Sequence, residues 1–327
     1  MKPFEFANPD SLDAAFALLD KPFEECEILA GGTDLLSLMK DFVIAPKRVV
    51  SLANVKELHG IKVAGDAVSI GAMTTLDELI AHPEIASRFP GLVQAAQGIK
   101  STQLRAMGTV GGELLQRPRC WYFRRGFGLL AVKDGASMVE VGEHRYHAVL
   151  GNGGPAKFVH PSSLAPMLLA LGAKVVVANK GGARTIPVSG LFQVPAAEGA
   201  RETALAPGDV LKSIELTGKS PTSATYEVRH RHGLDWPEVG ASVNVVLEGG
   251  KVKSVNAALG HVAPMPWDVS SAVSKALVGK ALDANTATEA AKAALEGATP
   301  LKNNGHKVEL ARVALKRALT KAAGTPV

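Results

Sequence analysis

The stretch Leu29-Ala-Gly-Gly-Thr-Asp-Leu-Leu36 places two adjacent glycines between two apolar runs near the start of the chain. Glycine adopts positive φ without steric cost and lets another group approach the backbone closely. Thr33 and Asp34 can cap the helix that Leu35 and the leucines after it predict. The pattern therefore predicts a strand, a glycine turn and a helix N-terminus. Such a turn either only connects two elements or binds a phosphate through its backbone N–H groups.

A second glycine-rich segment, Arg105-Ala-Met-Gly-Thr-Val-Gly-Gly112, also carries a threonine beside its paired glycines. Two such turns that face each other can wrap a pyrophosphate with backbone donors and hydroxyls. The alternative is two unrelated tight turns. Neither segment has the GxGxxG or GxxxxGK[ST] pattern, so a Rossmann or P-loop site has no support.

The composition excludes several classes of protein. The chain has 327 residues, enough for two or three domains, and its 46% hydrophobic and 20% charged content is typical of globular proteins. A net charge of +5 suits an anionic cofactor, but no nucleic-acid-binding motif accompanies it. Two cysteines cannot build a disulfide framework, and neither has metal-site spacing. No apolar run approaches the ~20 residues of a membrane span.

Helical and strand patterns alternate along the chain, which predicts an α+β or α/β protein. Helices are expected near residues 12–19, 34–40, 75–80, 89–96, 164–171, 270–278, 286–295 and 308–322. Strands are expected near 28–30, 48–52, 173–178, 224–229, 241–247 and 252–259, with a hairpin at 61–70. A shift in composition at Gly218–Pro221 marks a domain boundary. Residues 116–154 are irregular, and so long a loop is usually functional or mobile.

Several segments, in order, resemble the flavin-binding subunit of molybdenum hydroxylases, the xanthine dehydrogenase and carbon monoxide dehydrogenase family. They are LAGGTDLL (29–36), RAMGTVGGE (105–113), PSSLAPMLLALGAKV (161–175), DWPEVGASVNVVL (235–247) and GHVAPMPWDVSSAVSKALVGK (260–280). The resemblance implies an α+β fold with a two-part FAD-binding domain and a C-terminal α+β domain. The expected parts are 1–57, a small α/β unit; 58–220, a larger mixed-sheet unit with the loop 116–154; and 221–327.

The same resemblance implies one non-covalently bound FAD and names its contacts. The first pyrophosphate loop is matched by Leu29, Ala30, Gly31, Gly32, Thr33, Asp34 and Leu35, and the second by Thr109, Val110, Gly111 and Gly112. Leu191 matches a position whose backbone lies against the isoalloxazine ring. Three positions depart from the pattern: Glu113 replaces a common Asn, Ser163 an Asp that contacts the flavin nucleotide, and Glu227 a common Lys. A carboxylate at Glu113 is repelled by a pyrophosphate unless it turns away or meets a cation.

The loop 116–154 resembles an insertion found in the aldehyde-oxidoreductase branch of the family. LLQRPRCWYFR (114–124) and GEHRYHAVLGNGGP (142–155) match its two ends. In that branch the insertion holds a [4Fe–4S] cluster on four cysteines, whereas this loop has only Cys120. No cluster is therefore expected, and Cys120 and Cys26 are expected to be packed thiols.

The remaining polar groups have ordinary explanations, and no metal site is expected. His144, His147 and His160 are expected to be surface hydrogen-bonders, and His230 and His232 to lie at an exposed strand edge or partner contact. The basic and aromatic segment Arg117–Arg125 is interpreted as a docking patch for another subunit or as a solvated loop. The lysines of the C-terminal helices are expected to form a solvated face; they are Lys302, Lys307, Lys316 and Lys321.

The resemblance implies an oxidoreductase subunit with no catalytic residue of its own. A molybdopterin-binding large subunit would oxidise the substrate, and electrons would pass through the [2Fe–2S] clusters of a small subunit to FAD and an external acceptor. Two alternatives are a flavin-free scaffold subunit, suggested by Glu113, Ser163 and Glu227, and a stand-alone flavin oxidase. The N-terminus shows no export signal, so the cytoplasm is expected, or the periplasm by co-export with a signal-bearing partner.

Overall fold

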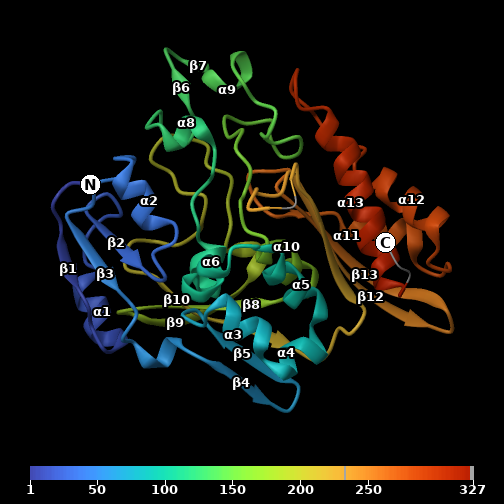
Figure 1. The fold of residues 1–327 in the computed structure, drawn as a ribbon, viewed down its shortest axis with the longest axis horizontal. Coiled ribbons are helices and arrows are strands. Elements are labelled where there is room, and N and C mark those ends of the chain that lie inside the picture. Colours follow the sequence, from blue (N-terminus) through green and yellow to red (C-terminus); the bar gives the residue numbers. More distant parts are fainter. Residues whose placement is uncertain (232, 325–327) are drawn as a thin grey trace.

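The computed structural model describes residues 1–231 and 233–324, which build three sheets of three to five strands, each with its own apolar core, and a separate two-stranded ribbon (Figure 1). The first is a parallel sheet in the order β1-β3-β2, formed by β1 (Glu5–Ala7), β2 (Cys26–Leu29) and β3 (Arg48–Ser51). Two helices belong to it, α1 (Leu12–Leu18) and α2 (Leu35–Lys40). Helix α1 confirms the helix expected near residues 12–19, and the Ser11 hydroxyl caps it by accepting the Ala14 N–H at 3.4 Å.

The second sheet has five antiparallel strands in the order β4-β5-β10-β8-β9. They are β4 (Ile61–Ala64), β5 (Ala67–Gly71), β8 (Lys174–Asn179), β9 (Gly182–Pro187) and β10 (Val210–Thr217), and the predicted 61–70 hairpin is confirmed. The sequence patterns missed two of these strands. β9 is an exposed edge strand without apolar alternation, and a register shift between Leu211 and Ser213 interrupts the alternation of β10.

Short helices cover this second sheet: α3 (Leu76–Ala81), α4 (Pro83–Arg88), α5 (Pro90–Gly98), α6 (Thr102–Met107), α7 (Val110–Leu114) and α10 (Leu164–Ala170). Two 3-10 turns, η1 (Lys56–Leu58) and η2 (Val188–Gly190), complete it. The second glycine segment differs from the expected turn. Gly111 and Gly112 lie inside α7, because the Thr109 hydroxyl caps this helix by accepting the Gly112 N–H at 3.1 Å.

Residues 116–154 form an ordered projection at the top of Figure 1, between the first and third sheets. The segment contains α8 (Trp121–Arg124), β6 (Val132–Lys133), β7 (Ala136–Ser137) and α9 (Met138–Val141). A small apolar core holds it against α2; its buried members are Leu38, Phe123, Leu129, Leu130, Ala156 and Phe158, with Cys120 packed beside them. Apolar packing thus organises a segment that resembles a metal-cluster insertion.

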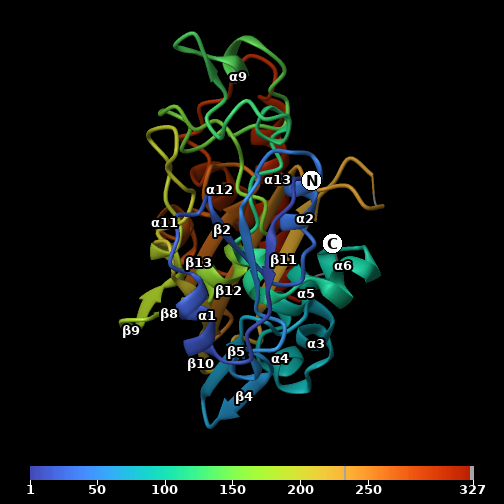
Figure 2. The same cartoon turned by 90° about the vertical axis from the view of Figure 1, so that its left-hand side faces the viewer.

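The third sheet, β11-β12-β13-β14, is antiparallel and carries three helices on one face (Figures 1 and 2). The strands are β11 (Ser223–Val228), β12 (Val239–Glu248), β13 (Lys251–Gly260) and β14 (Trp267–Asp268). The helices are α11 (Ser270–Leu277), α12 (Ala284–Ala293) and α13 (His306–Ala322). The largest apolar core lies between this sheet and its helices.

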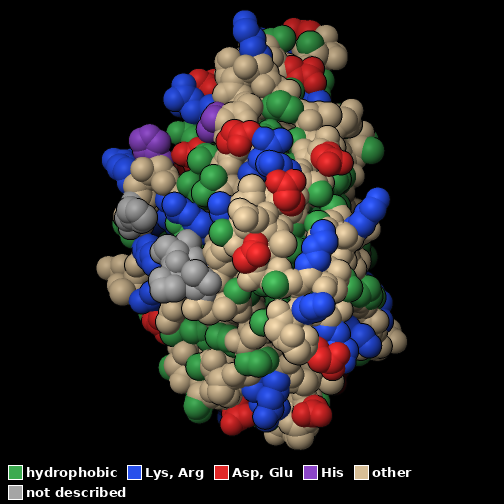
Figure 3. Space-filling model, turned by 90° about the vertical axis from the view of Figure 1, so that its right-hand side faces the viewer, with side chains coloured by type: hydrophobic (Ala, Val, Ile, Leu, Met, Phe, Trp, Pro, Cys, Tyr) green, Lys and Arg blue, Asp and Glu red, His purple; other side chains and the backbone are tan. Residues whose placement is uncertain are grey.

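The surface around the C-terminal helices carries both signs of charge, with basic and acidic side chains interspersed in Figure 3. Lys302 and Lys321 are exposed there, as expected. Lys307 contradicts the expectation, because it is only 1% exposed. Its ammonium is enclosed by backbone carbonyls rather than by solvent. In the described part of the chain, no helix is both long and apolar enough to cross a membrane.

Candidate functional site

The two glycine segments lie against each other between the first and second sheets. A Cβ on Gly31 would fall 1.8 Å from the carbonyl oxygen of Met107, and one on Gly112 would fall 3.6 Å from Cβ of Ala30. Gly31 therefore has no room for a side chain, and Gly32 adopts φ +76°. The sequence-based expectation that the segments face each other is correct.

The two segments differ in how their backbone N–H groups are used. Within the described residues, no group accepts the N–H of Gly31, Gly32, Thr33 or Asp34. In the second segment, by contrast, Val110 and Gly111 donate to the carbonyls of Thr74 and Ala72, each at 2.8 Å, and Gly112 donates to Thr109. Free backbone donors beside a positive-φ glycine form an anion-binding concavity. The first segment thus offers donors, and the second is a scaffold that adds the Thr109 hydroxyl.

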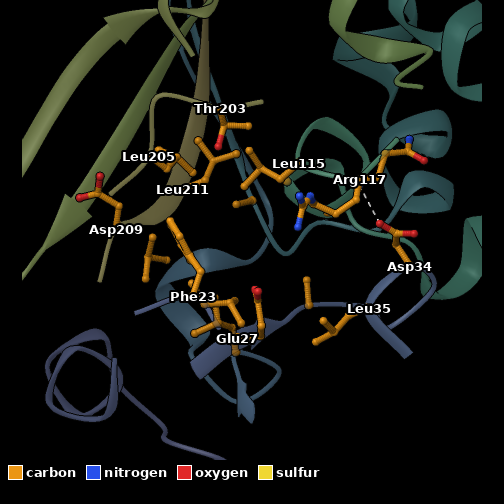
Figure 4. A pocket seen from close by; sticks show the side chains of 18 of the residues that line it. Phe23, Glu27, Asp34, Leu35, Leu115, Arg117, Thr203, Leu205, Asp209 and Leu211 are labelled. Carbon is orange, nitrogen blue, oxygen red and sulfur yellow. Dashed lines mark hydrogen bonds between the residues drawn. The ribbon is translucent and has the colours of Figure 1, made fainter. Parts of the chain in front are cut away.

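A cavity opens beside these segments, and Figure 4 shows side chains from both sheets pointing toward it. Of the predicted contacts it is lined by Ala30, Gly31, Gly32, Thr33, Asp34, Leu35, Thr109, Gly111 and Gly112. Leu29, Val110, Glu113, Ser163 and Leu191 do not line it. Leu35, Leu115, Leu205 and Leu211 supply apolar walls, so the cavity combines an apolar surface with a polar glycine edge.

Two ion pairs that the sequence did not predict line the same cavity. Arg201 lies 2.5 Å from Glu27 and stacks on the Phe23 ring at 4.3 Å, and Arg117 pairs with the buried Glu202. Burial lowers the pKa of Arg117 and raises that of Glu27. Each pair joins residues more than 80 positions apart, so no local pattern indicates it.

Asp34 does not cap α2 with its side chain, contrary to the expectation. Its carboxylate instead accepts the Arg117 N–H at 2.7 Å and the Arg124 Nη2 at 2.8 Å, and lies 3.2 Å from Arg119. The first glycine segment is thereby tied to residues 117–124. Three arginines of the proposed docking patch are thus turned inward, and only Arg125 of the four is exposed. These three arginines are half-buried in ion pairs within the chain, and docking of another subunit at this patch stays a prediction.

The three departures from the family pattern form one cluster away from the glycine edge. Glu113 turns to the start of α10, where it accepts the Ser163 N–H at 2.6 Å and the Ser162 hydroxyl at 2.5 Å. The Ser163 hydroxyl donates to Glu227 at 2.6 Å, and Glu227 pairs with Arg229 at 2.5 Å. The Glu113 carboxylate therefore points away from a phosphate bound at the glycine segments and would not repel it directly.

Comparison with known proteins decides the family. Residues 2–216 match the FAD binding domain in molybdopterin dehydrogenase, and residues 224–322 match the CO dehydrogenase flavoprotein C-terminal domain. The chain belongs to the FAD-binding medium subunits of the CO dehydrogenase and xanthine dehydrogenase family. This medium subunit is an oxidoreductase subunit and its cofactor is FAD, as predicted.

Individual relatives of the medium subunit agree over nearly its whole length. The carbon monoxide dehydrogenase medium chain of Hydrogenophaga pseudoflava is 30% identical over 98% of this chain and 96% of its own. The aldehyde oxidoreductase FAD-binding subunit PaoB of Escherichia coli is 30% identical over 83% of this chain and 85% of its own. A solved carbon monoxide dehydrogenase from Hydrogenophaga pseudoflava superimposes with a TM-score of 0.78 at 28% identity, covering 99% of both chains. The predicted α+β fold is therefore confirmed.

The residues present in this medium subunit fit the cofactor. The donors of residues 31–34 are free, and the absence of a side chain at Gly31 brings the Met107 carbonyl close to the loop. Helix-terminal and loop N–H groups of this kind bind phosphate. The apolar walls suit an aromatic or aliphatic portion of the ligand.

The buried carboxyl of Glu113 makes the stability of the medium subunit pH-dependent. Burial raises its pKa from 4.5 to about 7, although hydrogen bonds from Ser162, Ser163 and Leu164 oppose this. The folded form then binds more protons than the unfolded chain between pH 4.5 and 7. The contribution of Glu113 to the free energy of unfolding is therefore fully present below pH 4.5 and is lost as the pH rises through 7.

We expect Glu113→Gln to remove this dependence, which amounts to at most about 3 kcal/mol. The measurement is the free energy of unfolding by urea at pH 5 and pH 8. The wild type should lose more stability than the variant between the two values, and the exposed control Glu296→Gln should follow the wild type. Parallel profiles for wild type and Glu113→Gln would show that Glu113 is not protonated in the folded state.

The three histidines that the sequence suggested as surface groups are buried in the medium subunit. His144, His147 and His160 are each 3% exposed or less, contrary to the expectation of surface groups; His144, for example, bonds to the Val139 carbonyl. His230 is exposed, and His232 lies outside the described residues. In the described ranges no three His, Cys, Asp or Glu side chains are grouped to hold a metal ion. Burial raises the pKa of both thiols, Cys26 and Cys120, as suits packed cysteines.

Proposed function

We propose that the chain binds one FAD in the cavity between its first two sheets and passes electrons to an external acceptor. The single observation that carries this is the row of four free backbone donors at residues 31–34, beside a cavity of a family whose cofactor is FAD. Bound FAD supplies the redox chemistry, since it exchanges electrons singly or in pairs. The protein positions the cofactor and sets its surroundings.

The proposed contacts divide by the chemistry they offer. Backbone N–H groups of Gly31, Gly32, Thr33 and Asp34 and the Thr109 hydroxyl would hold the pyrophosphate, while Leu35 and Leu115 offer apolar contact. Leu29, Ala30, Val110, Gly111 and Gly112 shape the two segments around them. Glu113 acts through Ser163 by fixing the start of α10, and Leu191 is fully buried behind the cavity. No side chain is proposed as a catalytic acid or base.

We further propose that the chain works inside a complex. The relatives are named medium chains, and one solved relative is titled as lacking the Mo-pyranopterin moiety of its molybdenum cofactor. These names support partner subunits, one of them a large subunit that carries molybdopterin. A small subunit whose [2Fe–2S] clusters deliver electrons to FAD is a further part of the proposal. Assembly in the cytoplasm is proposed, with co-export to the periplasm as the alternative that cell fractionation tests.

The scaffold alternative, a subunit without flavin, draws on the Arg117–Glu202 and Arg201–Glu27 pairs that already occupy the cavity wall. The visible absorption spectrum of the purified chain, with acid release of the chromophore, separates the two. Oxidised-flavin bands and one released FAD per chain, without an iron–sulfur shoulder, support the proposal. A folded but colourless protein that gains no bands with added FAD would favour the scaffold. Co-purification with molybdenum and iron–sulfur subunits separates both from a stand-alone oxidase.

A further inference from the structure

A second cavity lies between the 116–161 segment and the connection from β11 to β12. Its walls include Arg119, Cys120, Trp121, Tyr146, His147 and Trp236. None of these side chains belongs to the set proposed to hold FAD. Two of the three tryptophans of the chain are therefore gathered at one cavity outside the glycine segments.

The walls of this second cavity are flat π-systems. The Arg119 guanidinium stacks over the Trp236 ring at 4.4 Å. The Trp121 ring meets Tyr146 edge-on at 5.8 Å and His147 at 5.5 Å. Aromatic rings and a planar guanidinium favour a flat aromatic occupant, which stacks on their faces.

Unpartnered polar atoms gather at the same place. Of the eight buried side-chain polar atoms without a hydrogen-bond partner in the described residues, three belong to residues that line this cavity. They are Nε of Arg119, Nδ1 of His147 and Nε2 of His261, and both histidines are 97% buried. Buried polar groups are almost always hydrogen-bonded, so such a concentration points to a missing ligand or water.

The contact between Cys120 and His147 determines what His147 can offer. Burial raises the pKa of the Cys120 thiol and lowers the pKa of His147 to about 4, so the first stays protonated and the second stays neutral. Sγ of Cys120 lies 3.2 Å from Nε2 of His147. When the thiol donates to Nε2, the imidazole carries its proton on Nδ1. His147 Nδ1 and Arg119 Nε are then two unused donors, which suit acceptor oxygens on a ligand.

The charges at this second cavity favour an uncharged ligand. Arg119 lies 3.2 Å from Asp34, and Arg231 pairs with Asp235 at 3.1 Å. Glu238 lies 3.3 Å from the imidazole of His306. Both arginines thus have a carboxylate partner, so neither is a free cation for an anionic ligand. A dinucleotide, whose pyrophosphate needs free cations or backbone donors, suits such walls less well than a neutral ring.

We propose that this second cavity binds a neutral aromatic ring bearing carbonyl oxygens, of the quinone class, as the external electron acceptor. Its place supports the role, because Arg119 contacts Asp34 of the first glycine segment, which lines the cavity proposed to hold FAD. A quinone becomes a hydroquinone by taking up two electrons and two protons, which fully reduced FAD carries in the same number. The acceptor role rests on the proposed function, whereas binding of the ring can be tested separately.

The test is a fluorescence titration of the full-length, FAD-loaded protein with tetramethyl-1,4-benzoquinone. Every ring carbon of this probe is substituted, so it does not add to the Cys120 thiol. Saturable quenching of tryptophan emission is expected. His147→Phe keeps a ring against Trp121 but removes the donor, and we expect it to weaken binding about tenfold, the value of one hydrogen bond. The control Trp267→Phe, outside the cavity, should leave the affinity unchanged.

A second variant protects the test against misfolding of His147→Phe. Trp236 is exposed at the rim, so Trp236→Leu removes the stacking surface without opening a core, and binding read through Trp121 should weaken several-fold. Quenching that rises without saturation, or equal affinity in all variants, would overturn the proposal. Saturable binding that occurs only after FAD is removed would also overturn it, because the flavin would then occupy the cavity. A protein that lacks FAD but binds the quinone fails the proposed function, not this site.

Discussion

Gly31→Ala is expected to weaken the binding of FAD strongly. The new Cβ would lie 1.8 Å from the Met107 carbonyl oxygen, which is backbone and cannot rotate away. The two glycine segments must then separate, which moves the free donors of residues 31–34 from their positions. Overpacking of this kind costs about 1–3 kcal/mol or more, equivalent to a loss of about 10- to 100-fold or more in FAD affinity.

The measurement is the molar ratio of FAD to protein after gel filtration, followed by titration of the stripped protein with FAD. Gly153→Ala is the matched control, because a Cβ there meets no atom within 4 Å and the residue does not adopt positive φ. Circular dichroism of both variants confirms that they fold. If folded Gly31→Ala holds as much FAD as Gly153→Ala, the cofactor does not depend on the contact between these segments.

Local signals in the sequence carried most of the fold. Ser11 and Thr75 each cap a helix by accepting a backbone N–H group, and each precedes an amphipathic pattern. Likewise, the alternation around Gly65 and Asp66 predicted the β4–β5 hairpin. These features depend on residues within a few positions of one another, so they can be predicted without the tertiary structure.

The errors concern contacts between distant residues. Asp34 was expected to cap α2, but it meets Arg117 and Arg124, which lie 83 and 90 positions away. The same contacts half-bury arginines of the basic segment Arg117–Arg125, whose composition suggested an exposed surface. The carboxyl of Glu113 is placed by Ser162 and Ser163, some 50 positions away. Charge alone indicates that a residue needs a partner; only the fold decides whether that partner is water or another residue.

Lys307→Met is expected to destabilise the protein by about 4 kcal/mol. Lys307 lies in the first turn of α13 and is 1% exposed. Its Nζ donates to the carbonyls of Tyr146 at 2.9 Å, His147 at 3.1 Å and His261 at 2.7 Å. Methionine fills a similar volume but donates no hydrogen bond. The His147 carbonyl keeps a bond from Asn304, whereas two buried carbonyls lose theirs, at about 1–3 kcal/mol each.

The comparison is made with Lys302→Met, an exposed lysine five residues earlier. Burial lowers the pKa of Lys307 to about 7, so unfolding is followed at pH 6, where the amine is an ammonium with three donors. The unfolding midpoint should fall by roughly 6 °C for Lys307→Met and by little for Lys302→Met. Proteolysis near residues 144–148 should also accelerate, because Lys307 joins this segment to the C-terminal helices. Equal stability of the two variants would mean that the carbonyls around Lys307 find other donors.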